Sequence, residues 1–331
     1  MIADAHTDLL LELDHREHRL GETDVFARTW LPLLEAGGVA LQVCPVFVAL
    51  DRQPEGTLRA ALAQVTSFHR AARENAERVI TVRRTGDVAE VKRGERLGLV
   101  LSLEGVEAFG YEVWPADTFW ELGVRMASLT WNRRNPFADG AAEVGGLSQL
   151  GARLVERLVE LGVILDLAHA SPATFADVLA RVGEAPVMVS HAACRAVHDH
   201  PRNLTDAQLE ALASRGGLLG IMLHPLAIDP ERRSIARVID HLEHAVSVMG
   251  AERVCLGGDF ARRIAQTMPH GPAPDGLMPP GLDAGSAIEG LAGPEDYPAL
   301  LGALTDHGWA QPAVDAVASG NLLRFLGTAL P

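Results

Sequence analysis

The sequence predicts an α/β protein, a closed (β/α)8 TIM barrel. Short apolar segments recur along the chain, helical periodicity separates them, and histidine or acidic residues stand where several of the apolar segments end. An open doubly wound sheet would show the same alternation of strands and helices. The third observation favours the barrel, because the carboxyl ends of its strands converge on one mouth.

Eight apolar segments rich in valine, isoleucine and leucine have the near-continuous hydrophobicity of strands that are covered on both faces. We expect these strands over residues 1–8, 39–47, 97–104, 124–131, 162–169, 186–191, 216–223 and 253–259. The count of eight is the number that a closed barrel of this kind requires.

Helical periodicity fills the segments between the expected strands. The expected helices span residues 57–76, 116–122, 148–161, 172–181, 205–215 and 232–249. Ser171 and Thr205 stand where a hydroxyl can cap the first free backbone N–H groups of a helix. Residues 271–293, rich in Gly, Pro and Ala, are expected to form a long loop over the barrel, and residues 298–326 one or two terminal helices.

Length and charge narrow the class of protein. The 331 residues are expected to form one catalytic domain, 1–331, because barrels of this size commonly fold as a single unit. Lys and Arg number 29 against 43 Asp and Glu, so the net charge is 29 − 43 = −14, without a basic run. A nucleic acid or an anionic membrane surface is therefore a poor partner, and a small-molecule substrate fits better.

The N-terminal residues and the cysteines suggest a cytoplasmic protein. Residues 1–4 show no basic segment followed by an apolar one, and no stretch of 18 apolar residues follows. Cys44, Cys194 and Cys255 lie far apart in apolar segments, as buried reduced thiols do.

Six polar residues at five predicted strand ends are the candidate site. They are His6, Asp8, Glu104, His169, His191 and Asp259. Each histidine taken singly is more often a core residue than a ligand. Together, the three imidazoles and the carboxylates of Asp8 and Glu104 form the mixture of donors that suits Zn²⁺, and one carboxylate can bridge two ions.

The individual positions support this interpretation and leave alternatives open. His6 and Asp8, two apart on a strand, would point the same way, with Asp4 supporting them from behind. Glu104 ends an apolar strand, where a carboxylate must be metal-bound or paired in a core salt bridge. Asp259, beside two glycines, can move a proton near a bound metal, or can itself be a ligand or a structural carboxylate. Arg202 suits a substrate carboxylate, or a surface salt bridge.

Eight short motifs occur in the order typical of one enzyme family. They are Asp4-Ala5-His6-Thr7-Asp8, Ser102-Leu103-Glu104-Gly105, Asp166-Leu167-Ala168-His169, Val189-Ser190-His191, Asp199-His200-Pro201-Arg202-Asn203-Leu204-Thr205-Asp206, Gly257-Gly258-Asp259-Phe260, Glu295-Asp296-Tyr297-Pro298 and Gly320-Asn321-Leu322-Leu323-Arg324. By these motifs, which cover most of the chain, the sequence resembles the membrane dipeptidase (renal dipeptidase) family of zinc peptidases, family M19, among the amidohydrolase-like barrels.

The resemblance implies two zinc ions per chain. His6 and Asp8 would bind one ion, Glu104 would bridge both, and His169 and His191 would hold the second. Members of the family cleave dipeptides, often with a D-residue at the C-terminal position, by a hydroxide held between the two metals, and they are often homodimers.

The same resemblance implies two further roles. Arg202 would meet the terminal carboxylate of the substrate, and Asp259 would handle the proton. Two ions lower the pKa of water, polarise the scissile carbonyl and stabilise the oxyanion, so no covalent intermediate is needed.

The sequence departs from the family pattern at three places in the expected pocket. Better-known members carry a histidine after a Leu-Thr pair, where this chain has Trp131-Asn132. An Asn-Phe-Tyr run after the seventh strand is replaced by Met222-Leu223-His224, and an Asp-Phe-Asp-Gly run after the eighth by Asp259-Phe260-Ala261-Arg262. Trp131, Asn132 and His224 are therefore the expected substrate-binding residues.

Three functions remain open at this point. The first is a zinc dipeptidase. The second, motivated by Trp131 and His224, is a binuclear hydrolase of another small amide or a dipeptide-like metabolite. The third, from a different class, is an inactive metal-binding scaffold, against which the full ligand set and Asp259 argue.

Overall fold

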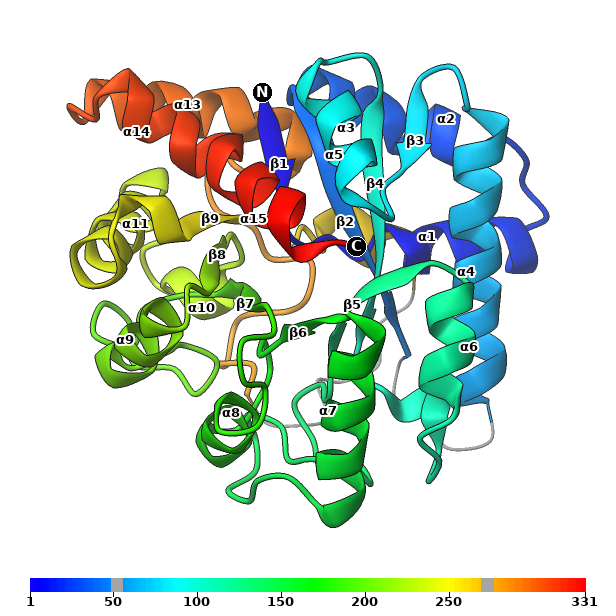
Figure 1. The fold of residues 1–331 in the computed structure, drawn as a ribbon. Coiled ribbons are helices and arrows are strands. Elements are labelled where there is room, and N and C mark those ends of the chain that lie inside the picture. Colours follow the sequence, from blue (N-terminus) through cyan, green and yellow to red (C-terminus); the bar gives the residue numbers. More distant parts are fainter. Residues whose placement is uncertain (49–55, 269–276) are drawn as a thin grey trace.

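Eight parallel strands close into a barrel that helices surround in the computed structural model, which describes residues 1–48, 56–268 and 277–331 (Figure 1). The barrel strands are β1 (Ile2–Asp4), β2 (Val39–Phe47), β4 (Leu97–Glu104), β5 (Val124–Ser128), β6 (Ile164–Asp166), β7 (Val187–Ala192), β8 (Leu218–Met222) and β9 (Val254–Gly257). The order around the sheet is β2-β1-β9-β8-β7-β6-β5-β4, and the pairing of β2 with β4 closes the ring. The predicted (β/α)8 barrel is confirmed.

A ninth strand, β3 (Val79–Thr81), lies outside the ring and pairs with the first residues of β4. The sequence analysis missed it because three residues are too few to show a periodicity.

Several strands end earlier than predicted. β1 ends at Asp4 and β6 at Asp166, so His6, Asp8 and His169 lie in the loops that follow, and Asp259 lies two residues beyond β9. The prediction that His6 and Asp8 alternate on a strand is wrong: Asp8 precedes α1 as its N-cap residue. His169 and Asp259 have the left-handed φ values of 64° and 47°, which turn the chain out of the sheet at these positions.

Fifteen α-helices lie within the described residues, and the six predicted between strands are among them. They are α1 (Leu9–Asp14), α2 (Val25–Thr29), α3 (Leu31–Ala36), α4 (Thr57–Glu74), α5 (Thr85–Lys92), α6 (Pro115–Glu121), α7 (Gln149–Leu161), α8 (Pro172–Leu179), α9 (Asp206–Ser214), α10 (Pro225–Ile228), α11 (Ile235–Met249), α12 (Arg262–Thr267), α13 (Tyr297–Asp306), α14 (Gln311–Asp315) and α15 (Asn321–Ala329).

The predicted helix caps form, because Ser171 accepts a hydrogen bond from the N–H of Thr174 and Thr205 one from the N–H of Gln208. The predicted terminal segment holds three α-helices, α13 to α15, instead of one or two. Of the predicted loop, residues 271–276 lie outside the described residues, and 277–293 contain turns and two isolated bridges. No helix in the described ranges is long and apolar enough to span a bilayer.

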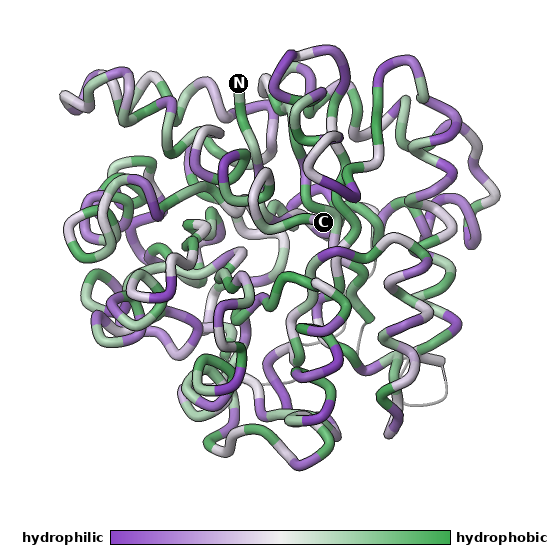
Figure 2. The backbone as a smooth tube through the Cα atoms, viewed as in Figure 1, coloured by the Kyte–Doolittle hydropathy of each residue, from purple (hydrophilic) through white to green (hydrophobic). Residues whose placement is uncertain are grey.

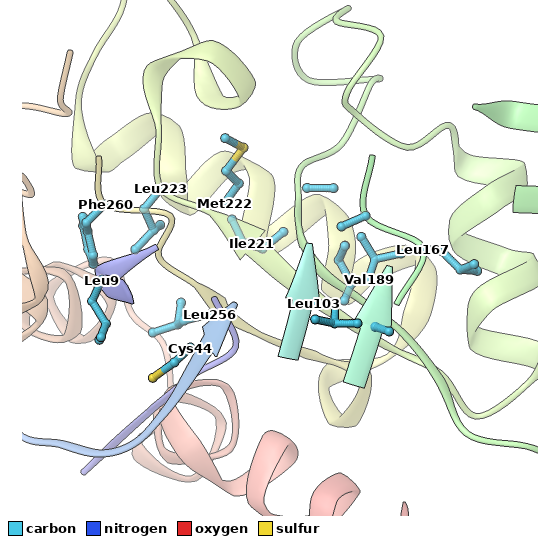
Figure 3. Close-up of a cluster of buried hydrophobic side chains, with 14 of the residues drawn as sticks. Leu9, Cys44, Leu103, Leu167, Val189, Ile221, Met222, Leu223, Leu256 and Phe260 are labelled. Carbon is cyan, nitrogen blue, oxygen red and sulfur yellow. The ribbon is translucent and has the colours of Figure 1, made fainter. Parts of the chain in front are cut away.

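Two apolar layers hold the barrel together. The outer layer packs between strands and helices and includes Leu103, Leu167, Val189 and Leu256 (Figure 3). Figure 2 shows hydrophobic residues concentrated along the central strands and mixed with polar ones along the surrounding helices. Burying this apolar surface is the main favourable contribution to folding.

The inner layer joins alternate residues of the strands to α15. Val43, Val100 and Met188 point inward and cluster with Leu322 and Leu326 of that helix. The amide of Asn321 donates hydrogen bonds to the carbonyls of Ala251 (2.7 Å) and Val254 (2.8 Å), at the start of β9. Helix α15 therefore closes the amino end of the barrel and leaves the carboxyl end for chemistry.

Candidate active site

The six predicted residues converge at the carboxyl end of the barrel, although they come from five different parts of the chain. His6 Nε2 lies 3.5 Å from Glu104 Oε2, 3.9 Å from Asp8 Oδ1 and 3.9 Å from Asp259 Oδ1. The loop after β1, the end of β4 and the loop after β9 thus contribute one imidazole and three carboxylates to one place.

Two further imidazoles lie on the other side of Glu104. His169 Nε2 is 2.7 Å from Glu104 Oε1 and 2.8 Å from His191 Nε2, and His191 Nε2 is 3.7 Å from the same oxygen. The rings of His6 and His191 lie close, with centroids 3.7 Å apart. One oxygen of Glu104 therefore faces His6, and the other faces the pair His169 and His191.

Several buried polar atoms of this cluster fit a divalent metal ion. His6 Nε2, Asp8 Oδ1 and Glu104 Oε2 are buried and find no hydrogen-bond partner within the described residues. Leaving such atoms unpaired is costly, and a cation would satisfy them. Donor atoms of His6, Glu104 and His191 lie within 4.8 Å of one another, as do those of His6, Asp8 and Asp259. Nitrogen and carboxylate donors in such groups suit zinc and similar ions.

The electrostatics of the cluster differ between its two sides. Burial raises the pKa of Asp8 well above its usual range, and the charge of Glu104 adds to this effect. Burial disfavours a charged His6, but Glu104, Asp8 and Asp259 outweigh it and raise its pKa to about 10. Burial, followed by the charge of Arg202, lowers the pKa of His169 to about 4, so this imidazole is neutral and keeps a lone pair for a ligand.

Asp4 holds the first side of the cluster in place from below. This fully buried carboxylate accepts hydrogen bonds from the N–H of His6 (3.1 Å), the hydroxyl of Thr7 (3.0 Å) and the N–H of Gly258 (2.7 Å). The N–H of Asp259 in turn donates to the carbonyl of His6 (2.8 Å). Asp4 therefore ties the loop that carries His6 to the loop that carries Asp259, a support that the sequence analysis expected for the first loop alone.

Asp166 does the same for the second side. Its Oδ1 accepts hydrogen bonds from the N–H of Ala168 (2.9 Å) and from the N–H of Ser190 (2.9 Å), which joins the loop after β6 to β7. The hydroxyl of Ser190 is 2.8 Å from His191 Nδ1. Asp166 belongs to one of the motifs, but its role could not be predicted, because one of the two N–H groups that donate to it, that of Ser190, lies on the neighbouring strand.

Asn132 lies behind His169. Its Oδ1 is 2.7 Å from His169 Nδ1, and the residue is 4% exposed. Because an amide oxygen only accepts, His169 Nδ1 donates in this contact, which directs Nε2 toward Glu104 and His191. Asn132 thus orients this imidazole, a contact that its prediction as a substrate-binding residue did not include.

Arg202 brings a buried positive charge to the same end of the barrel. Its side chain is buried, its Nη2 donates to the carbonyl of His191 (3.2 Å), and its charge acts on both His169 and Asp259. The alternative prediction, a salt bridge at the surface, is wrong, because Arg202 is 3% exposed. A guanidinium in this position can bind a carboxylate.

Trp131 and His224 stand on different sides of the cluster. The Trp131 ring lies against His169, with centroids 6.1 Å apart, and against Phe47, at 5.3 Å. His224 follows β8, and its Nδ1 accepts a hydrogen bond from the N–H of Leu226 (3.2 Å), so its Nε2 carries the proton. The charge of Asp259 acts on the His224 ring.

Sequence comparison with known proteins identifies the family of this chain, and structural comparison finds the same fold. The family described as Membrane dipeptidase (Peptidase family M19) matches residues 1–271. Dipeptidase verJ of Clonostachys rogersoniana is 30% identical over 326 residues, which cover 95% of this chain and 77% of the relative. Dipeptidase aclJ of Aspergillus oryzae is 30% identical and covers 95% of this chain and 72% of its own length.

A solved structure shows the same fold. The metallo peptidase from Rhodobacter sphaeroides, liganded with a phosphinate mimic of the dipeptide L-Ala-D-Ala, superimposes with a TM-score of 0.85. It is 23% identical, and the match covers 98% of both chains. The resemblance inferred from the motifs is confirmed, and the family implies a metal at the cluster described above. The chain belongs to the membrane dipeptidase family, peptidase family M19.

Proposed function

We propose that this chain is a zinc-dependent dipeptidase that holds two ions at the cluster. In this proposal His6 and Asp8 would hold one ion, His169 and His191 would hold the second, and Glu104 would serve both. The observation that carries the proposal is the position of Glu104, whose two oxygens face His6 on one side and the pair of imidazoles on the other. A carboxylate between two groups of donors is the arrangement that a binuclear site needs.

When bound, the ions would supply Lewis acidity to the peptide carbonyl and to a water molecule. The residues around the ions would transfer the proton and orient the substrate. Asp259 Oδ1 lies 3.9 Å from His6 Nε2, so its carboxylate is within reach of a water at the cluster. Asp259 can take the proton that the attacking water loses and deliver it to the amine that leaves.

Arg202 would orient the substrate. Its buried guanidinium lies behind His191 and is suited to the C-terminal carboxylate of a dipeptide. Holding the carboxylate end of the substrate in this way would set the direction in which the substrate lies across the cluster.

The proposal treats residues 1–331 as one catalytic domain. Helix α15 supports this assignment, because it comes from the far end of the chain and fills the amino end of the barrel. The closest competing function, hydrolysis of another small amide, is motivated by Trp131, which stands beside His169 in place of the histidine of better-known members.

The test is hydrolysis of a panel of L,L and L,D dipeptides by the zinc-loaded chain, with release of free amino acids as the readout. The panel is run beside N-acylated dipeptides and cyclic dipeptides, which lack a free amine or a free carboxylate. We expect turnover of free dipeptides that disappears on chelation and returns with zinc. Turnover of the blocked or cyclic amides alone would favour the competing function, and bound zinc without turnover of any amide would favour the inactive scaffold.

A further inference from the structure

Two aromatic rings, Phe47 and Trp131, form a wall on one side of the cluster. Phe47 is the last residue of β2 and stands in register with Glu104 on β4. In-register residues of neighbouring strands point to the same side of a sheet, so the Phe47 ring lies on the side to which Glu104 points. The ring centroids of Phe47 and Trp131 are 5.3 Å apart and their planes are inclined by 59°.

This aromatic wall borders the candidate metal ligands directly. The Trp131 ring lies 6.1 Å from the ring of His169 between centroids. Phe47 and Trp131 are only half-buried, unlike the fully enclosed aromatic residues of the core such as Phe68 and Phe119. Large apolar rings that remain accessible beside a polar site are typical of ligand-binding surfaces.

The aromatic wall begins across the barrel from Arg202, at Phe47, and its other member, Trp131, lies nearer to that residue. Around the ring of eight strands, β2, which ends at Phe47, is four strands away from β7, the strand that precedes Arg202, and β5, which precedes Trp131, is two strands away from β7. His224 follows β8, next to β7. A substrate whose carboxylate is held on the β7 side therefore extends its other end across Glu104 toward Phe47 and Trp131.

We propose that Phe47 and Trp131 form the binding site for the side chain of the N-terminal residue, and that the chain prefers dipeptides with a large apolar or aromatic residue there. The inference rests on the proposed function, because Arg202 sets the direction of the substrate. Burial of an apolar side chain against two rings removes both surfaces from water and adds ring-to-ring contact. A glycine or alanine at this position would leave the rings exposed.

The experiment measures kcat/KM for two matched series of dipeptides. The first series varies the N-terminal residue, with Gly-Ala, Ala-Ala, Leu-Ala and Phe-Ala, each made with L- and D-alanine. The second series varies the C-terminal residue, with Ala-Gly, Ala-Leu and Ala-Phe. We expect kcat/KM for Phe-Ala to exceed that for Gly-Ala by about 10-fold or more, which is the discrimination that an apolar pocket achieves. We expect the second series to show a smaller spread.

Trp131→Ala and Phe47→Ala test whether the aromatic wall causes this preference. Each substitution is expected to lower the ratio of kcat/KM for Phe-Ala to kcat/KM for Gly-Ala by about 10-fold. Tyr111→Ala is the matched control, because Tyr111 is an aromatic residue outside the cluster that is 78% exposed. If the ring only shielded His169 from water, its removal would change kcat/KM for Gly-Ala and for Phe-Ala equally.

Three results would overturn the inference. They are equal kcat/KM for Gly-Ala and Phe-Ala, a preference that survives in both wall variants, and a preference confined to the C-terminal series. If the wild type cleaves no dipeptide, the proposed function fails separately. Calorimetric binding of Phe-Ala and Gly-Ala to the zinc-loaded Asp259→Asn variant then decides the inference: tighter binding of Phe-Ala supports it, and equal or absent binding contradicts it.

Discussion

The two sides of the candidate active site are supported in the same way but differ in the residues that offer donor atoms to a metal. The β1–β9 side consists of His6, Asp8 and Asp259, and the β6–β7 side of His169 and His191. A buried aspartate ties two neighbouring segments together on each side, Asp4 on the first and Asp166 on the second.

The difference lies in charge. Carboxylates dominate the β1–β9 side, where burial and mutual repulsion raise the pKa of Asp8 and where a cation is most needed. Neutral imidazoles make up the β6–β7 side, where burial lowers the pKa of both histidines. Glu104 is the one carboxylate that both sides share. The two sides therefore depend on different supports, and a substitution on one side should weaken metal binding on that side alone, except at Glu104.

The largest effect is expected for Glu104→Gln, because it removes the shared carboxylate. Bound zinc should fall on both sides at once, and kcat/KM should drop by more than about 10³-fold. Metal analysis and dipeptide hydrolysis measure the two effects. Glu17→Gln is the matched control, since Glu17 is a buried carboxylate outside the cluster that accepts hydrogen bonds from the Ser67 hydroxyl (2.8 Å) and from Arg70 (3.0 Å). A Glu104 variant that keeps both ions would show that the two sides are independent of it.

Asp259→Asn is expected to separate proton transfer from metal binding on the β1–β9 side. Asparagine tolerates the left-handed backbone that Asp259 adopts, so the loop should keep its shape. We expect kcat to fall by about 10² to 10⁴-fold while the zinc content stays unchanged. If the zinc content falls together with activity, Asp259 is a ligand, and the β1–β9 side has three metal donors instead of two.

Asp4→Asn and Asp166→Asn test whether each buried aspartate serves only its own side. Both are positioning residues, and each substitution is expected to weaken one of two stepwise metal affinities by about 10 to 100-fold. The absorption spectrum of the cobalt-substituted chain should change differently in the two variants. Asp229→Asn is the control, because Asp229 is a buried aspartate that accepts the N–H groups of Glu231 and Arg232 away from the cluster. Equal loss of both affinities in either variant would contradict the separation.

The smallest effect is expected for Asn132, which contacts the β6–β7 side through His169. Asn132→Ala should reduce metal affinity on that side by about 10-fold, because the imidazole loses the acceptor that orients it. Asn132→Asp should restore the affinity, since a carboxylate oxygen also accepts from His169 Nδ1. If the Asn132→Asp substitution does not restore the metal affinity, Asn132 acts on the substrate instead.

The sequence alone was sufficient to predict the barrel and to name six residues that converge at its carboxyl end, for reasons that particular residues make clear. Glu104 and His191 are found within strands of continuous hydrophobicity, so the carboxyl ends of these strands could be located. His6 and Asp8 were grouped correctly for the wrong reason, because their proximity comes from the turn into α1 and not from alternation along a strand.

Other features could not be predicted because they depend on contacts between distant segments. The left-handed turns at His169 and Asp259 could not be located, because histidine and aspartate adopt this conformation more often than most residues but still only in a minority of cases. The role of Asp166 requires the N–H of Ser190 on the next strand, and the role of α15 requires the interior of the barrel. The aromatic wall joins residues 84 positions apart, 131 − 47, and became visible only in the assembled fold.

Zinc titration of the metal-free chain, with hydrolysis of a dipeptide followed at each addition, tests the central claim most directly. The account predicts binding of two equivalents per chain, with full activity only when both sides of the cluster are filled. Saturation and full turnover at one equivalent would contradict a site in which Glu104 bridges two ions.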